Sequence, residues 1–93
     1  MNIDTKVDFA KTVFAQEVDG EMVLLDMNSE HYFGLDEVGS VIWQALEASH
    51  GNLQRVLEVL VETYDIEEDV LRKDLMYFIK KLVESGLVEV NTQ

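Results

Sequence analysis

The side chains that most often carry catalysis or bind metals are few in this sequence and are not grouped. Its histidines are His31 and His50, and it has no cysteine. Neither histidine is followed by a metal-binding residue three or four positions later, and thiolate zinc sites are excluded. The serines lack the G-x-S-x-G context of a nucleophile elbow, and the glycines form no phosphate-binding loop. We therefore expect no catalytic residue, no metal site and no cofactor, and a small hydrolase or metal protein is the least favoured class.

The chemistry that the sequence does offer is backbone hydrogen bonding along a short strand. The run HYFGL, from His31 to Leu35, is predicted to be the last strand of a sheet, because no later strand is obvious enough to cover it. A strand at a sheet edge has unpaired N–H and C=O groups, which a guest peptide can use as one more strand. This predicts a protein that works by holding an extended chain.

A second feature that could bind a partner is the predicted last helix, which starts near Glu67 or Glu68 and runs to Ser85. Its core stripe contains Leu71, Leu75, Phe78, Ile79 and Leu82. A second row beside this stripe contains Val70, Asp74, Tyr77 and Lys81. The row has two interpretations. It either widens the buried face, or it lines a groove in which Tyr77 is an amphipathic anchor and Asp74 a fixed acceptor.

The strands before the predicted edge form a meander. Strand-like runs extend from Val13 to Val18 and from Glu21 to Met27, and the Asp19-Gly20 pair between them suits a type I′ turn. Asn28-Ser29-Glu30 forms the next turn. The first and third strands are therefore expected at the two edges of a three-stranded sheet.

Helices follow the meander. Asp36 is a predicted N-cap for the first helix, in which Trp43 is expected to anchor the core, and Asn52 is a predicted N-cap for the second helix. The stripe from Leu53 to Tyr64 is the cleanest amphipathic pattern in the chain, and Leu87 to Val90 is predicted to add a short strand at the end. We predict one α+β domain over residues 1–93. It is winged helix-turn-helix-like, with a three-stranded antiparallel N-terminal sheet followed by three helices and a short C-terminal strand.

The charge of the chain limits its partners. Nineteen acidic residues against seven basic ones give a net charge of −12, and such a field repels the phosphates of nucleic acids. It favours a cationic partner, although solubility alone also explains an acidic surface. No apolar run is long enough to span a bilayer, and the first residues lack the features of a signal peptide. With no cysteine, a cytoplasmic location is expected.

Two segments resemble one known family. The run LLDMNSEHYFGLDEVGSVIW, ending at Trp43, resembles the PqqD-like family, the peptide chaperones also called RiPP recognition elements. Its usual pattern is a strand ending in LLD, a turn, an aromatic strand ending in G-L-(N/D), and a helix carrying G and I-W. The later run VLRKDLMYFIKKLVESGLV is similar to the family's second signature, an Asp in the last helix followed by apolar positions and a closing G-L. The stretch from the start of the first segment, Leu24, to the end of the second, Val88, is most of the chain.

The resemblance implies a winged helix-turn-helix fold that binds peptide. Members grip the leader segment of a ribosomally made precursor as an added strand, fill the groove beside the last helix with its side chains, and present the precursor to modifying enzymes. The residues that this implies for backbone pairing are Glu30, His31, Tyr32, Phe33, Gly34 and Leu35. Those implied for the groove wall are Val70, Asp74, Tyr77, Phe78 and Lys81, and those implied as scaffold are Leu25, Leu35, Ile42 and Trp43.

The branch of the family is indicated by two details. The quinone-cofactor chaperones, which serve a radical enzyme, usually carry a proline near the second strand, and this chain has none. The short form with DEVGSVIW looks more like the leader-binding proteins of lasso-peptide pathways. The implied partners are then a precursor leader peptide, a leader peptidase and an ATP-dependent macrolactam cyclase. A basic leader would be steered to this acidic domain at low salt.

A winged-helix DNA-binding regulator is the alternative of another class. The order of elements fits, but a recognition helix normally presents several Arg and Lys side chains. The second predicted helix has only Arg55, beside Glu58 and Glu62. We therefore expect no binding to nucleic acid.

Overall fold

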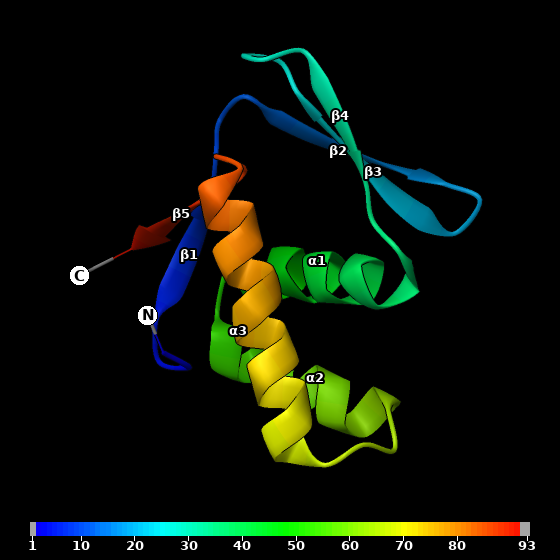
Figure 1. Cartoon of the computed structure of the whole chain (residues 1–93), viewed down its shortest axis with the longest axis vertical. Coiled ribbons are helices and arrows are strands. Elements are labelled where there is room, and N and C mark those ends of the chain that lie inside the picture. The colour runs from blue at the N-terminus through cyan, green and yellow to red at the C-terminus, as the bar shows by residue number, and fades with distance from the viewer. Residues whose placement is uncertain (1, 92–93) are drawn as a thin grey trace.

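A computed structural model describes residues 2–91, and its three-stranded sheet has the predicted meander topology (Figure 1). Strands β2 (Val13–Val18), β3 (Glu21–Asp26) and β4 (His31–Gly34) are antiparallel in the order β2-β3-β4. Asp19 and Gly20 have φ values of 52° and 85°, as both central residues of a type I′ turn require. The hairpin prediction is therefore confirmed.

A second, two-stranded ribbon joins the two ends of the chain. Strand β1 (Lys6–Phe9) pairs antiparallel with β5 (Val88–Asn91). The sequence predicted the last strand but not its partner, because four residues with one fully buried side chain, Val7, give no periodic signal. The ribbon lies close to the turn at Gly51, where a Cβ would meet the backbone carbonyl of Val7 and φ is +83°. Only glycine combines that conformation with that approach.

Three helices follow the sheet, as predicted. They are α1 (Glu37–Ser49), α2 (Leu53–Thr63) and α3 (Glu68–Glu84). The Asp36 carboxylate accepts from the Gly39 N–H at 2.7 Å, and the Asn52 side chain accepts from the Arg55 N–H at 3.1 Å, so both predicted N-caps are formed. No helix within residues 2–91 has the length and apolar character needed to cross a membrane.

The core lies between the helices, one face of the three-stranded sheet and the ribbon (Figure 1). Trp43 is 2% exposed and its ring centroid lies 4.8 Å from that of Phe9, which confirms it as a core anchor. Leu24 from β3, Leu46 from α1 and Ile79 from α3 are fully buried around it. Truncating one such side chain to alanine costs about 2–5 kcal/mol, so this core holds the sheet and α3 in a fixed relation.

Candidate functional site

Strand β4 lies at an edge of the sheet. It pairs with β3 on one side, and no strand among residues 2–91 pairs with its other side. The final strand β5, which could have covered this edge, is in the separate ribbon with β1. β4 ends at Gly34, one residue before the predicted end of the strand at Leu35. The Leu35 N–H nevertheless donates to the Met22 carbonyl at 2.9 Å.

The pairing with β3 identifies which backbone groups of β4 are open. In an antiparallel pair, hydrogen-bonded and non-hydrogen-bonded residues alternate. The Leu35–Met22 bond makes Leu35 a bonded position, so Phe33 and His31 also direct their N–H and C=O groups toward β3. Tyr32 and Gly34 then direct theirs to the free edge. The edge therefore offers the N–H and C=O groups of two residues.

Asp26 fixes the turn that leads into β4. Its side chain accepts hydrogen bonds from the Asn28 N–H and the Ser29 hydroxyl, each at 3.0 Å, and from the Thr12 hydroxyl at 3.1 Å. Burial alone would raise the pKa of Asp26, but these hydrogen bonds outweigh it and hold the pKa below its usual value. The turn closes with Glu30 at φ 60°, whose N–H donates to the Asp26 carbonyl at 2.7 Å.

Ser40 fixes the other end of β4. Its side chain is buried, with the residue 3% exposed, and its hydroxyl accepts from the Met22 N–H at 2.9 Å and donates to the Leu35 carbonyl at 3.4 Å. The hydroxyl thus connects the first turn of α1 to the start of β3 and the end of β4. The sequence analysis assigned no role to Ser40 or to Asp26, because the bond of Ser40 to Met22 and that of Asp26 to Thr12 join residues more than ten positions apart.

Helix α3 approaches this end of β4 through Phe78. A Cβ placed on Gly39 would come 3.1 and 3.3 Å from two atoms of the Phe78 ring, so the ring lies directly on the first turn of α1. Phe78 is half-buried against the core. Because Asp74 and Lys81 lie one turn to either side of Phe78 on the helix, the predicted second row is on the flank that faces the β4–α1 junction.

The second row on α3 is exposed. Val70 and Tyr77 are 46% and 63% exposed, and Asp74 and Lys81 are also exposed. The Lys81 Nζ lies 5.3 Å from the centroid of the Tyr77 ring, a cation–π distance. Within residues 2–91, Asp74 forms no ion pair. The row therefore does not widen the core but presents apolar, aromatic and charged groups to solvent.

The side chains of β4 divide between two faces of the sheet. Phe33 is opposite the fully buried Leu24, so Phe33 and His31 face the helices, and their ring centroids are 6.4 Å apart. Tyr32 is opposite Leu25 on the other face and is 72% exposed. The structure thus brings the α3 row and the helix-facing side of β4 to one side of the molecule, and it places the Tyr32 ring on the opposite side of the sheet.

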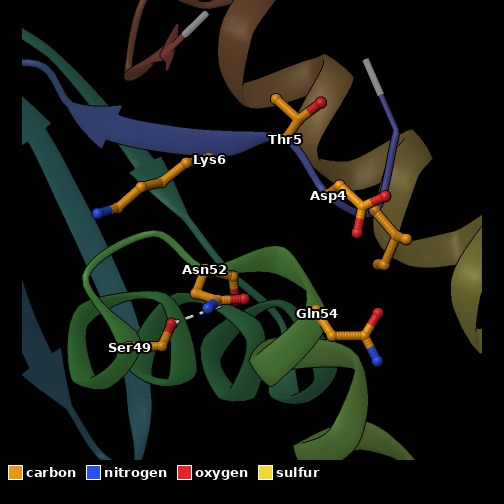
Figure 2. A pocket seen from close by; sticks show the side chains of 7 residues that line it. Asp4, Thr5, Lys6, Ser49, Asn52 and Gln54 are labelled. Atoms are coloured by element: carbon orange, nitrogen blue, oxygen red, sulfur yellow. Dashed lines mark hydrogen bonds between the residues drawn. The ribbon is translucent and has the colours of Figure 1, made fainter. Parts of the chain in front are cut away.

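Two cavities in the described chain lie away from these residues. One, of about 280 Å³, is lined by β1 and the α1–α2 turn and includes Lys6, Ser49 and Asn52 (Figure 2). The other, of about 560 Å³, includes Phe9, Lys11 and residues near the end of α3. Neither contains a predicted site residue. The candidate site is therefore an open surface along β4 and α3, which suits an extended peptide better than a small molecule.

A comparison with known protein families shows which family this chain belongs to. The family model described as Coenzyme PQQ synthesis protein D (PqqD) matches residues 21–88. The chain belongs to the PqqD family. The match begins at β3 and ends at β5, so it includes β4, the Asp26 turn and the whole of α3. Members of the PqqD family are non-catalytic peptide-binding domains, and within residues 2–91 no group of histidine and acidic side chains is placed to hold a metal ion.

Two solved structures are similar to this PqqD-family chain over nearly its whole length. One is TbiB1 in complex with the TbiA(beta) leader peptide, with 30% identity, a TM-score of 0.83, and coverage of 88% of this chain and 94% of that one. The other is lasso peptide synthetase B1 complexed with the leader peptide, with 25% identity, a TM-score of 0.80, and coverage of 90% and 98%. A search of curated proteins found no match.

Proposed function

We propose that this chain is a recognition domain for the leader peptide of a ribosomally synthesised and post-translationally modified peptide. The leader binds as an added strand on β4, and part of its side chains lie against the exposed row on α3. The domain performs no chemistry itself. It holds the precursor so that separate enzymes can modify it, and residues 1–93 act as one binding unit in the cytoplasm.

The observation that carries this proposal is the open edge at Tyr32 and Gly34 beside an exposed helix flank. Strand addition uses backbone hydrogen bonds for affinity and neighbouring side chains for specificity. The edge offers the backbone N–H and C=O groups of two residues, and the α3 flank offers apolar, aromatic and charged contacts. The two similar structures each contain a leader peptide, which supports the same type of ligand here.

The predicted site residues have different roles in this proposal. Tyr32 and Gly34 supply the backbone groups, while Glu30 and Leu35 hold the two ends of the strand. His31 and Phe33 present their side chains to the helix-facing side. The contacts to the leader side chains come from the α3 residues Val70, Asp74, Tyr77, Phe78 and Lys81.

Within this class, we propose a lasso-peptide pathway. The segment DEVGSVIW and the similarity to lasso peptide synthetase B1 both favour it. The partners are then a leader peptidase and an ATP-dependent macrolactam cyclase. The net charge of −12 favours a leader with basic residues. A chaperone for a radical enzyme of quinone-cofactor or another peptide-modification pathway is the alternative within the family.

The test is a titration of the ¹⁵N-labelled chain with synthetic peptides made from the short reading frames that flank its gene. We expect the amide signals of residues 30–35 and of α3 to shift, and the amide signals of α2 to remain unchanged. A scan with N-methylated leader residues sharpens the test, because each N-methyl group removes one donor. If the leader binds as an added strand, we expect N-methylation to weaken binding at every second residue along a short segment of the leader. A uniform effect, or shifts confined to other surfaces, would contradict the proposal.

No observation favours the DNA-binding alternative. Arg55, the one basic residue of α2, is paired with Glu58 at 2.9 Å. A gel shift at low salt with mixed duplex DNA is the check, and we expect no retarded band.

A further inference from the structure

The outer edge of β2 is a second strand edge that no strand among residues 2–91 covers. All six residues of β2 pair with β3 in one unbroken register, and the strand contains no proline, lysine or bulge. Those are devices that usually keep an edge strand from pairing with another chain. Figure 1 shows the β2–β3 hairpin projecting beyond all three helices at the right of the view. The β2 edge is therefore accessible to a further strand.

Two copies of β2 can pair antiparallel in a register that uses the open backbone groups of both strands. The Met27 N–H donates to the Thr12 carbonyl, so by alternation Ala15 and Glu17 direct their backbone groups to the edge. If Ala15 lies opposite Glu17 of a second copy, twofold symmetry places Glu17 opposite Ala15 of that copy as well. Each of these two pairs exchanges both of its N–H···O=C bonds.

The neighbouring registers are less favourable. A shift by two residues in one direction sets Glu17 directly opposite Glu17 of the second copy, and like charges in that position destabilise a strand pair. A shift in the other direction requires the N–H of Val13, which already donates to the Ala10 carbonyl at 3.2 Å. One register is therefore favoured over its neighbours.

The side chains on the outer face of the sheet fit the same register. Phe14 and Val18 are on this face and are 61% and 47% exposed. Each Phe14 would lie opposite Val18 of the second copy, in a non-hydrogen-bonded pair, where side chains approach most closely. Aromatic and β-branched residues stabilise a sheet when they are paired across strands. The two exposed apolar side chains of β2 would thus cover each other.

The charges beside β2 are also complementary in this register. Continuing it past the strand ends brings Lys11 opposite Glu21 of the second copy, once at each end of the interface. Both residues are exposed, and neither forms an ion pair within residues 2–91. The two Glu17 residues are offset along the sheet, so their backbone positions are roughly 8 Å apart. The register therefore pairs unlike charges and separates like charges.

We infer that two copies of this chain associate through their β2 edges into a symmetric dimer with one continuous six-stranded sheet. The two β4 edges lie at opposite ends of that sheet, five strand spacings or roughly 24 Å apart, so both stay open. The paired edge is small for a protein interface, and the net charge of −12 on each chain opposes association. We therefore expect a dissociation constant of about 10–500 μM.

Sedimentation velocity of the full chain, up to a concentration of about 500 μM, tests the dimer. The mean mass should rise from 10.7 kDa toward twice that value, and more steeply at high salt, which screens the net charge. Ala15→Pro removes one outward N–H from each copy and should keep the chain monomeric. Gly34→Pro makes the same change on the β4 edge and should dimerise like wild type. A monomeric wild type, or a dimer that survives Ala15→Pro, overturns the inference.

A charge swap tests the register. Lys11→Glu and Glu21→Lys each place like charges opposite one another, so each should weaken the dimer by about three- to tenfold at low salt, and the double variant should restore it. Within one chain these residues lie at opposite ends of β2, roughly 24 Å apart, so recovery has to arise between copies. Net charge alone predicts opposite effects of the two single variants. Opposite effects, or no recovery in the double variant, overturn the inference.

The dimer does not depend on the proposed function, and the outcomes of the two tests are distinguishable. A dimer that binds one leader per chain supports both. If added leader dissociates the dimer, the copies are joined through β4, and the inference fails while leader recognition stands. A chain that dimerises as described but binds no leader contradicts the proposed function alone.

Discussion

The sheet has two open edges, and they differ in their surroundings rather than in their backbone. On β2, the Met27 N–H donates to the Thr12 carbonyl, so by alternation Ala15 and Glu17 direct their backbone groups outward. On β4, Tyr32 and Gly34 do the same. Val13 also points outward, but its N–H already donates to the Ala10 carbonyl, so each edge offers the N–H and C=O groups of two residues. Within residues 2–91 neither edge is paired with another strand.

What distinguishes β4 is the support around it. Side-chain hydrogen bonds of Asp26 and Ser40 hold the two ends of β4. The contact of the Phe78 ring with Gly39 brings the exposed flank of α3 to the C-terminal end of β4. β2 is mostly exposed along its length, and its Glu17 side chain accepts a hydrogen bond from the Gln44 side chain of α1 at 3.2 Å. Free backbone groups are common at sheet edges, so in the proposed function a binding edge differs from an ordinary edge by a rigid frame and specific side chains beside it.

The largest expected effect comes from blocking one edge at a time. Gly34→Pro removes an outward N–H without removing a bond to β3, and a Cβ on Gly34 would meet nothing within 4 Å. A bound leader would lose that donor and meet the proline ring. We expect leader affinity to fall at least tenfold, since an unmade hydrogen bond costs about 1–3 kcal/mol. Isothermal titration calorimetry gives the affinity.

Ala15→Pro is the control for that substitution, since it removes the equivalent outward donor on β2. Leader affinity should stay within about twofold of wild type. If both prolines weaken binding equally while circular dichroism shows both variants folded, the distinction between the two edges is wrong.

A second prediction concerns the frame. Ser40→Ala leaves the Met22 N–H buried without its acceptor, so the free energy of unfolding should fall by about 1–3 kcal/mol. Urea denaturation measures it. Ser49→Ala, in the same helix but at its end, is the control and should change stability by no more than about 0.5 kcal/mol. Equal effects of the two substitutions would show that the Ser40 hydroxyl does not hold β4.

A smaller effect is expected on the α3 flank. Asp74→Asn keeps the shape of an exposed side chain but removes its charge, so it should weaken binding of a basic leader by about 0.5–1 kcal/mol, or two- to fivefold, at low salt. The loss should shrink at 0.5 M NaCl because salt screens exposed charges. Asp65→Asn, on the loop before α3, is the matched control. A salt-independent loss at Asp74 would point to a change in packing rather than in charge.

The smallest effect is the pH dependence from Asp26. Its pKa is lowered in the folded chain, so its stabilising contribution is fully present above the unfolded pKa of about 3.9 and is lost as pH falls through the folded value. NMR titration of the carboxyl carbon should therefore give a pKa for Asp26 below the ordinary aspartate value of about 3.9. Asp26→Asn should flatten the dependence of stability on pH below about 4. An ordinary pKa at Asp26 would contradict the turn geometry.

Much of the fold was predictable because it depends on local rules. The Asp19-Gly20 turn, the caps at Asp36 and Asn52, and the spacing of apolar residues in the helices follow from backbone conformation and side-chain period within a few residues. The position of β4 at an edge was also predicted. Its placement beside the α3 row was expected only through the family resemblance, because no local signal relates segments 40 residues apart.

The sequence by itself therefore determined the order and type of most elements, the strongly acidic charge and the shortage of catalytic side chains. Tertiary structure alone decided that β1 pairs with β5, that Tyr32 and Gly34 rather than their neighbours face the open edge, and that Phe78 lies on Gly39. The physical reason is the range of the interactions. Turns, caps and helical periods are set by neighbouring residues, whereas strand partners, register and helix–strand contacts are set by burial of a shared core that forms only when distant segments meet.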